Sequence, residues 1–92
     1  MISRKNRNRF SIETDIDREA GLILIKAYDK ELNRNWFVFE NDVHKLSEEH
    51  EDLKQYILFK WHGIKSGKYQ VEGFDIENYI DFPPLGFKPT LQ

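Results

Sequence analysis

The sequence predicts an α+β domain, in which a small antiparallel sheet of about four strands carries one long helix packed on it. Two observations predict this class. Between residues 10 and 40, apolar residues occur in short runs of strand length. Between residues 42 and 62, they recur at a spacing of three and four, which is typical of one helix face. The chain has 92 residues, the length of a single domain.

The first nine residues are polar and basic and show no hydrophobic periodicity, so we expect a flexible arm over residues 1–9. Closely spaced cations neutralise phosphates and release counterions, which makes the arm a candidate nucleic-acid contact. Its candidate contact residues are Arg4, Lys5, Arg7 and Arg9. A solubilising terminus without a partner would explain the same composition.

Three strands are predicted before residue 41. Phe10 and Ile12 alternate with polar residues, which indicates a short strand, and a connection is expected over residues 15–20. Residues 21–28 (GLILIKAY) contain a continuous apolar run, and residues 34–40 (RNWFVFE) follow a polar turn. The second and third strands therefore form a predicted hairpin with a loop of about five residues.

One helix is predicted from about residue 42 to residue 62. Asn41 or Asp42 can cap it, and Ser47 offers an alternative start for a second helix. Gly63 suits the left-handed position just past the end of a helix. The predicted apolar face consists of Val43, Leu46, His50, Leu53, Ile57 and Ile64.

The last third of the chain contains further predicted elements. Residues 69–74 (YQVEGF) alternate and indicate a fourth strand. Residues 75–82 have helical spacing, and Pro83 and Pro84 end this short helix because a proline disfavours helical backbone before it. A proline-containing tail is expected over residues 83–92.

No motif indicates catalysis, metal binding or a cofactor. The absence of cysteine excludes disulfides and thiolate chemistry, and the three histidines lack the spacing of metal ligands. Residues 63–68 (GIKSGK) differ from a phosphate-binding loop, because the spacer is one residue short and Tyr69 replaces the magnesium-binding hydroxyl. No apolar run approaches the roughly 20 residues of a membrane span. We therefore expect a cytoplasmic, non-enzymatic protein with no cofactor, membrane or small-molecule substrate.

Acidic residues gather in three clusters. Residues 10–92 hold ten basic and sixteen acidic residues, although the net charge of the whole chain is only −2. The first cluster consists of Glu13, Asp15, Asp17 and Glu19; the second of Glu48, Glu49, Glu51 and Asp52; the third of Glu72, Asp75, Glu77 and Asp81. In extended backbone, alternate residues lie on one side about 6.6–6.8 Å apart, so the first cluster can imitate a phosphate track. An ordinary solvated surface explains each cluster taken singly.

The chain is similar in general character to the small accessory proteins of T-even bacteriophages. Its size, its lack of cysteine, its acidic body and its frequent Lys, Asn, Ile and Phe carry this similarity. Among these proteins it resembles the Arn-type anti-restriction family over its whole length. The chain departs from the pattern of strong DNA mimics in its basic N-terminal segment and in its mild net charge of −2.

The resemblance implies an inhibitor that mimics DNA. Such proteins present carboxylates where phosphates would lie and occupy the DNA-binding surface of a restriction endonuclease of the McrBC type. They are not enzymes, need no cofactor, and many are dimers. On this sequence the three acidic clusters would be the phosphate-mimicking residues, and the protein would act in the cytoplasm of an infected bacterial host.

Two alternatives to an acidic inhibitor follow from the same sequence. The first is a small nucleic-acid-binding regulator that uses the basic residues of the N-terminal segment. The second is an assembly subunit held by an apolar patch made from Trp36, Phe39 or Phe74.

Overall fold

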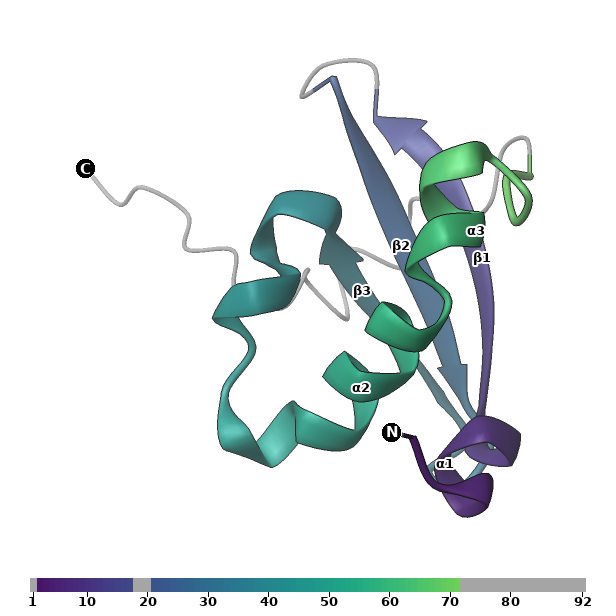
Figure 1. Ribbon diagram of the computed structural model, residues 1–92, viewed down its shortest axis with the longest axis vertical. Helices are drawn as coiled ribbons and strands as arrows, with labels where there is room; N and C mark the ends of the chain where they lie inside the picture. The colour runs from purple at the N-terminus through teal and green to yellow at the C-terminus, as the bar shows by residue number, and fades with distance from the viewer. Residues whose placement is uncertain (1, 18–20, 72–92) are drawn as a thin grey trace.

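The structure is a computed structural model that describes residues 2–17 and 21–71 (Figure 1). It is an α+β fold in which a three-stranded sheet is covered by several short helices. Within the described residues, no helix is long and apolar enough to cross a membrane. In chain order, the elements are α1 (Arg4–Arg9), β1 (Phe10–Asp17), β2 (Leu22–Asp29), β3 (Arg34–Phe39), η1 (Glu40–Lys45), η2 (Glu48–His50), α2 (Glu51–Phe59) and α3 (Trp61–Ser66).

The sheet is antiparallel with the strand order β1-β2-β3. Its register places Thr14 opposite Ile25 and Ile25 opposite Val38. The predicted hairpin is confirmed, with Asn33 in the left-handed region at a φ of 54°, where Asn is among the better tolerated residues. The predicted connection is wrong over residues 15–17, because β1 continues to pair with β2 as far as Asp17.

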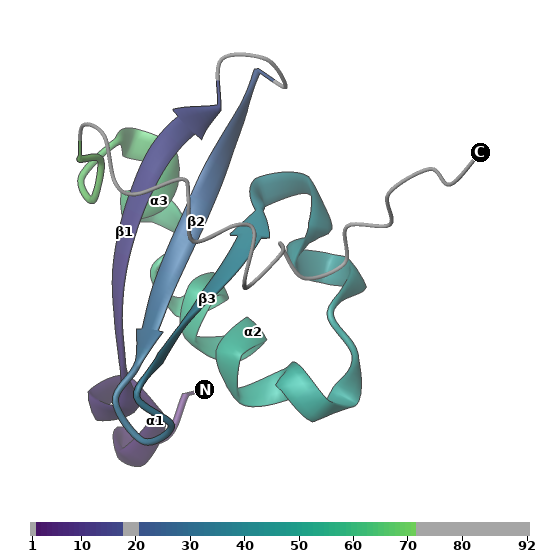
Figure 2. The ribbon, with the colours of Figure 1, turned by 180° about the vertical axis from the view of Figure 1, so that it is seen from behind.

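The helices cover one face of this sheet, as the front and back views show (Figures 1 and 2). The predicted apolar face from residue 43 to residue 64 is confirmed as part of this core, although His50 is only half-buried. The buried core between the helices and the sheet consists of Phe10, Ile25, Ala27, Val38, Val43, Leu46, Leu53, Tyr56, Ile57 and Ile64.

The single long helix is not observed, because four short segments occupy residues 40–66. Leu46 and Ser47 have extended backbone between η1 and η2, and Lys60 separates α2 from α3 at φ −96° and ψ 7°. A straight helix over residues 42–62 would be about 31 Å long, whereas the longest strands, β1 and β2 with eight residues each, span only about 27 Å. The breaks keep the apolar side chains over the sheet instead of beyond its edge.

Gly63 was predicted to end the helix, but it lies inside α3, and Gly67 takes the left-handed position at a φ of 84°. A Cβ atom on Gly63 would approach Cε2 of Tyr69 to 2.5 Å. Glycine at position 63 therefore allows the Tyr69 ring to pack against α3. The second glycine of the GIKSGK sequence is the helix terminator, not the first.

Residues 69–71 lie along the outer edge of β1. The Thr14 amide donates to the Tyr69 carbonyl at 3.0 Å, and the Val71 amide donates to the Thr14 carbonyl at 2.9 Å. This is an isolated parallel bridge, so the predicted fourth strand is not shown. Residues 72–74, the predicted helix at 75–82 and the predicted tail at 83–92 lie outside the described residues.

The predicted flexible arm is wrong over residues 4–9, which form helix α1. Ser3 caps this helix, since its hydroxyl accepts a hydrogen bond from the Asn6 amide at 3.2 Å. Asn6 is only 8% exposed, and Arg9 is anchored to Asp29 of the sheet. A short helix is marginal on its own, so these tertiary contacts account for its formation.

Candidate interaction site

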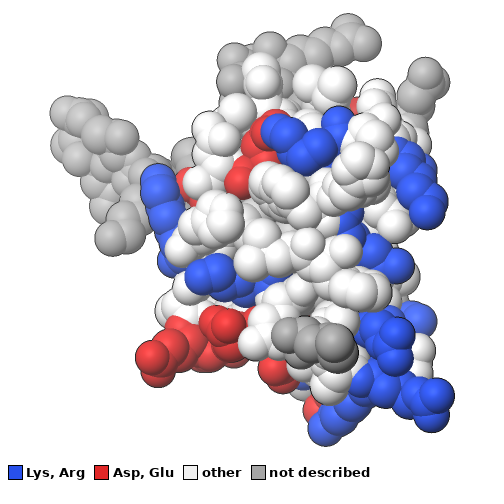
Figure 3. Space-filling model, viewed as in Figure 1, with Lys and Arg blue, Asp and Glu red and all other residues white. Residues whose placement is uncertain are grey.

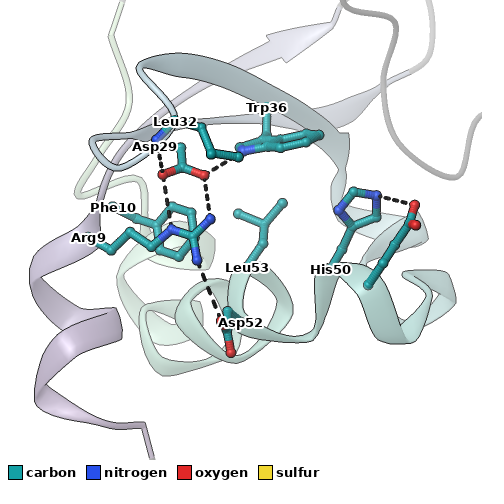
Figure 4. Close-up of a pocket in the computed structure, with 9 residues that line it drawn as sticks. Arg9, Phe10, Asp29, Leu32, Trp36, His50, Asp52 and Leu53 are labelled. Carbon is teal, nitrogen blue, oxygen red and sulfur yellow. Dashed lines mark hydrogen bonds and ion pairs between the residues drawn. The ribbon is translucent and has the colours of Figure 1, made fainter.

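A buried carboxylate anchors the end of the sheet nearest α1. Asp29, the last residue of β2, is 0% exposed. Its Oδ1 accepts a hydrogen bond from Arg9 Nε at 3.0 Å, and its Oδ2 accepts from Arg9 Nη2 at 2.8 Å and Trp36 Nε1 at 3.1 Å. The backbone amides of Glu31 and Leu32 also donate to Oδ1, at 3.0 and 3.1 Å. Asp29 thus joins α1, the hairpin turn and β3 (Figure 4).

These hydrogen bonds control the charge state of Asp29. Burial alone would raise the pKa of its carboxyl group, but the hydrogen bonds from Arg9, Trp36 and Leu32 outweigh burial and lower that pKa to about 2. The hydrogen bond to Asp29 likewise raises the pKa of Arg9. The pair is therefore ionised at neutral pH, and both charges are satisfied within the fold.

A cavity of about 330 Å³ opens beside this ion pair. Figure 4 shows the Trp36 indole on one side of it, Arg9 on another, and Leu53 and His50 projecting towards it from the helical layer. The cavity is lined by Arg9, Phe10, Asp29, Leu32, Trp36, Glu49, His50, Asp52 and Leu53, and we call it the Trp36 pocket. The chain forms it by bringing together the end of α1, the start of β1, the hairpin, η2 and the start of α2.

Two members of the second acidic cluster, Glu49 and Asp52, line the Trp36 pocket. The four carboxylates of this cluster, in η2 and the first turn of α2, are all on exposed residues. Negative charge is favourable in the first turn of a helix, which explains why Glu51 and Asp52 are tolerated so close together. Three members have described partners. Glu49 lies 3.1 Å from His50 Nε2, and Asp52 lies 3.5 Å from Arg9 Nη1. Glu51 Oε1 accepts a hydrogen bond from Gln55 Nε2 at 3.3 Å.

The two described side chains of the first acidic cluster do not join the second cluster. Phe10 and Ile12 of β1 pack towards the helices, so the alternate residues Glu13 and Asp15 lie on the opposite face of the sheet. Glu13 forms an ion pair with Lys26 at 2.7 Å, and Asp15 accepts a hydrogen bond from the Ile16 amide at 2.8 Å. Glu13 and Asp15 therefore do not form one continuous acidic track with the second cluster.

The side chains of the remaining predicted acidic residues are not described by the structure. Asp17 is the last residue of β1, and Glu19 lies outside the described residues. All four members of the third cluster, Glu72, Asp75, Glu77 and Asp81, also lie outside them.

The basic residues of α1 divide into two kinds. Arg9 is 18% exposed at its side chain and is held by Asp29, with Glu31 and Asp52 each at 3.5 Å. The three other predicted cations, Arg4, Lys5 and Arg7, are exposed on α1. Figure 3 shows their basic surface at the same end of the molecule as the red patch formed over η2 and the start of α2.

Sequence analysis missed the roles of Asp29 and Trp36. Asp29 was taken as part of a polar turn, and Trp36 as a member of an apolar patch. An aspartate at the end of a strand can accept hydrogen bonds from the turn amides that follow it, and this was the available signal for Asp29. The side-chain partners Arg9 and Trp36 carry no local signal, since Arg9 lies 20 residues away in sequence.

Comparisons of the chain with protein-family models, with curated proteins and with solved structures found no match in any of the three. The described residues contain no group of three or more His, Cys, Asp or Glu side chains arranged to hold a metal ion. The arrangement of charges around the Trp36 pocket is therefore the basis for a functional proposal.

Proposed function

We propose that the protein is a non-enzymatic interaction protein that inhibits a DNA-binding protein by presenting carboxylates in place of DNA phosphates. One observation carries this proposal: four of the five consecutive residues 48–52 are exposed acids. Surfaces that bind DNA are rich in Lys and Arg, so a compact group of carboxylates complements them. Ion pairing with Lys26 makes Glu13 of the first cluster a weaker candidate.

The partner in this proposal is a host restriction endonuclease of the McrBC type or another host DNA-binding protein. The resemblance to the Arn-type anti-restriction proteins supports this choice, and it places the action in the cytoplasm of an infected bacterium. The second cluster covers only a short stretch of surface. A homodimer would double its number of carboxylates, and we include this assembly in the proposal.

Competition with DNA tests the proposal. The purified protein is titrated into a complex of the restriction enzyme with labelled duplex DNA, and release of the DNA is followed by fluorescence anisotropy. We expect the wild type to displace DNA and the variant E48Q/E49Q/E51Q/D52N to lose this ability. Neutralisation removes the charges while keeping similar side-chain shapes, so the fold is retained.

The matched control neutralises the first cluster with E13Q/D15N/D17N/E19Q, which changes the net charge by the same amount. We expect this variant to compete as the wild type does. Loss of competition in the control alone would indicate that the interface lies on the opposite face of the sheet. Equal competition by both variants and the wild type would contradict the proposal.

A nucleic-acid-binding regulator is the second candidate, and one observation favours it. Arg4, Lys5 and Arg7 are exposed, and none of them forms an ion pair with another described residue. Titration of labelled duplex DNA at about 50 mM salt tests this candidate, because phosphate contacts are strong at low salt. Salt-sensitive binding that is lost in R4Q/K5Q/R7Q would favour this function over mimicry.

A further inference from the structure

We propose that the Trp36 pocket binds the guanidinium group of an arginine side chain from the protein partner. This inference rests on the proposed function, in which the second acidic cluster meets the basic surface of a DNA-binding partner. It assigns one arginine of that surface to the Trp36 pocket. Three features of the pocket carry it: its charge, its aromatic wall and its shape.

The lining of the pocket has an excess of negative charge. It contains three carboxylates, on Asp29, Glu49 and Asp52, and one permanent cation, Arg9. Two hydrogen bonds join Arg9 to Asp29, so these two charges largely compensate each other. Glu49 and Asp52 remain at the mouth with side chains 77% and 57% exposed. A cation that enters the pocket therefore meets two largely exposed carboxylates. Asp52 is only 3.5 Å from Arg9, which Asp29 already compensates, and Glu49 lies 3.1 Å from His50.

The aromatic wall suits a planar cation. Indole is the best aromatic partner for a cation, and guanidinium groups are found over it more often than ammonium groups. The Trp36 ring already has one such contact, since the Arg34 guanidinium carbon lies 3.7 Å from its centroid. Arg34 is not among the residues that line the pocket. His50 packs against the indole at 5.0 Å with its ring tilted by 64°, which helps to hold Trp36 in place.

The size and rigidity of the pocket favour one side chain as its occupant. A volume of about 330 Å³ lies at the small end of the range for ligand sites. Leu32 and Leu53 provide apolar surface for the methylene groups of an arginine. The hydrogen bond from Trp36 to Asp29 fixes the indole before binding, so little ordering is required on association.

The fluorescence of Trp36 gives a direct test. Trp61 is the other tryptophan of the 92 residues, so Trp61→Phe leaves Trp36 as the sole reporter among them. A blocked tri-arginine peptide is titrated at about 150 mM salt, where the Debye length is about 8 Å and distant charges are screened. A tri-citrulline peptide of nearly the same shape but without charge is the control ligand. We expect a saturable change with tri-arginine and none with tri-citrulline; equal responses, or no response to tri-arginine, would overturn the proposal.

Two double variants separate the pocket from general attraction to the acidic surface. E49Q/D52N neutralises the two exposed carboxylates that line the pocket, whereas E48Q/E51Q neutralises two neighbours in the same cluster that do not. Both remove the same charge from the same segment. We expect tri-arginine to bind about tenfold more weakly to E49Q/D52N and to change by less than about twofold in E48Q/E51Q. Equal weakening in the two variants would overturn the pocket as the site.

The same pair distinguishes failure of this inference from failure of the proposed function. In the DNA-competition assay, a larger loss for E49Q/D52N than for E48Q/E51Q supports the pocket as the site of an arginine contact. Equal losses of competition in the two variants would support the acidic inhibitor but reject the pocket as the site of an arginine contact. No loss in either variant, together with an unaffected E48Q/E49Q/E51Q/D52N protein, would reject both.

Discussion

Asp29 and Asp52 both contact the guanidinium of Arg9, but they lie in opposite environments. Asp29 is 0% exposed and accepts hydrogen bonds from Arg9, Trp36 and two backbone amides. Asp52 has a side chain that is 57% exposed and lies 3.5 Å from the same guanidinium. One cation therefore holds a structural carboxylate on its inner side and a solvent-facing carboxylate on its outer side.

This difference shows how the chain separates charges that stabilise the fold from charges that face the solvent. A buried ion pair depends on complete hydrogen bonding, and removing one partner leaves the other desolvated. An exposed pair is weakened by water and salt, so its loss has little effect on stability. We expect mutations on the two sides of Arg9 to differ strongly in stability.

The largest effect is expected for Asp29→Ala. This change leaves Arg9 and Trp36 without their shared acceptor, and we expect a loss of ~3–5 kcal/mol in the free energy of unfolding. Urea denaturation followed by circular dichroism measures it. A loss below about 1 kcal/mol would show that Asp29 does not anchor the hairpin to α1 as the hydrogen bonds indicate.

Acid should remove a large part of the stability that ionised Asp29 provides, because protonation neutralises its carboxylate. The pKa of Asp29 is lowered to about 2 in the fold, below its ordinary value of about 3.9 in an unfolded chain. The stabilisation of the fold by ionised Asp29 is therefore complete above about pH 4 and is lost as the pH falls towards 2. This stabilisation amounts to about 2 kcal/mol of unfolding free energy. Urea denaturation at pH 5 and pH 2 measures it. The acid sensitivity of Asp29→Asn should be smaller by this amount, and equal sensitivity would exclude Asp29 as its source.

A smaller effect is expected for Trp36→Phe. The phenyl ring keeps an aromatic wall in the Trp36 pocket but cannot donate to Asp29, so we expect a loss of about 1.5 kcal/mol in unfolding free energy. Trp61→Phe is the matched control, because no hydrogen bond to Asp29 is removed. Comparable losses in both variants would attribute the effect to ring packing instead of the hydrogen bond.

The smallest effect is expected for Asp52→Ala. Its exposed contact with Arg9 belongs to a class that contributes roughly 0–1 kcal/mol, so the unfolding free energy should remain within about 0.5 kcal/mol of the wild type. The measurement is the one used for Asp29→Ala, under the same buffer and salt. A loss as large as that of Asp29→Ala would remove the distinction between the two sides of Arg9.

Local patterns predicted the hairpin and the apolar face of residues 43–64, because both depend on the spacing of apolar residues along a short stretch. A second start at Ser47 was raised only as an alternative, and the break at Lys60 was not predicted, since the apolar periodicity continues through both positions. Helix α1 was missed for a related reason. Its stability depends on Asp29, which follows Arg9 by 20 residues and carries no signal in the helix itself.

The candidate site shows the same division. The second acidic cluster is visible in the sequence because its four residues are nearly consecutive. The Trp36 pocket is not, because its lining comes from α1, the start of β1, the hairpin, η2 and the start of α2. The sequence also grouped Arg9 with Arg4, Lys5 and Arg7, whereas the fold places Arg9 in an ion pair and leaves the other three exposed.

The sequence by itself determined the α+β class, the paired strands of the hairpin, the apolar helical face and the excess of acidic residues. These properties follow from residue type and short-range spacing, which act before the chain is folded. The tertiary structure decided where the helical region breaks, that residues 4–9 are helical, which face holds each described acidic cluster, and which charges are neutralised. Those properties depend on contacts between residues distant in the sequence, such as the hydrogen bonds that join Arg9, Asp29 and Trp36.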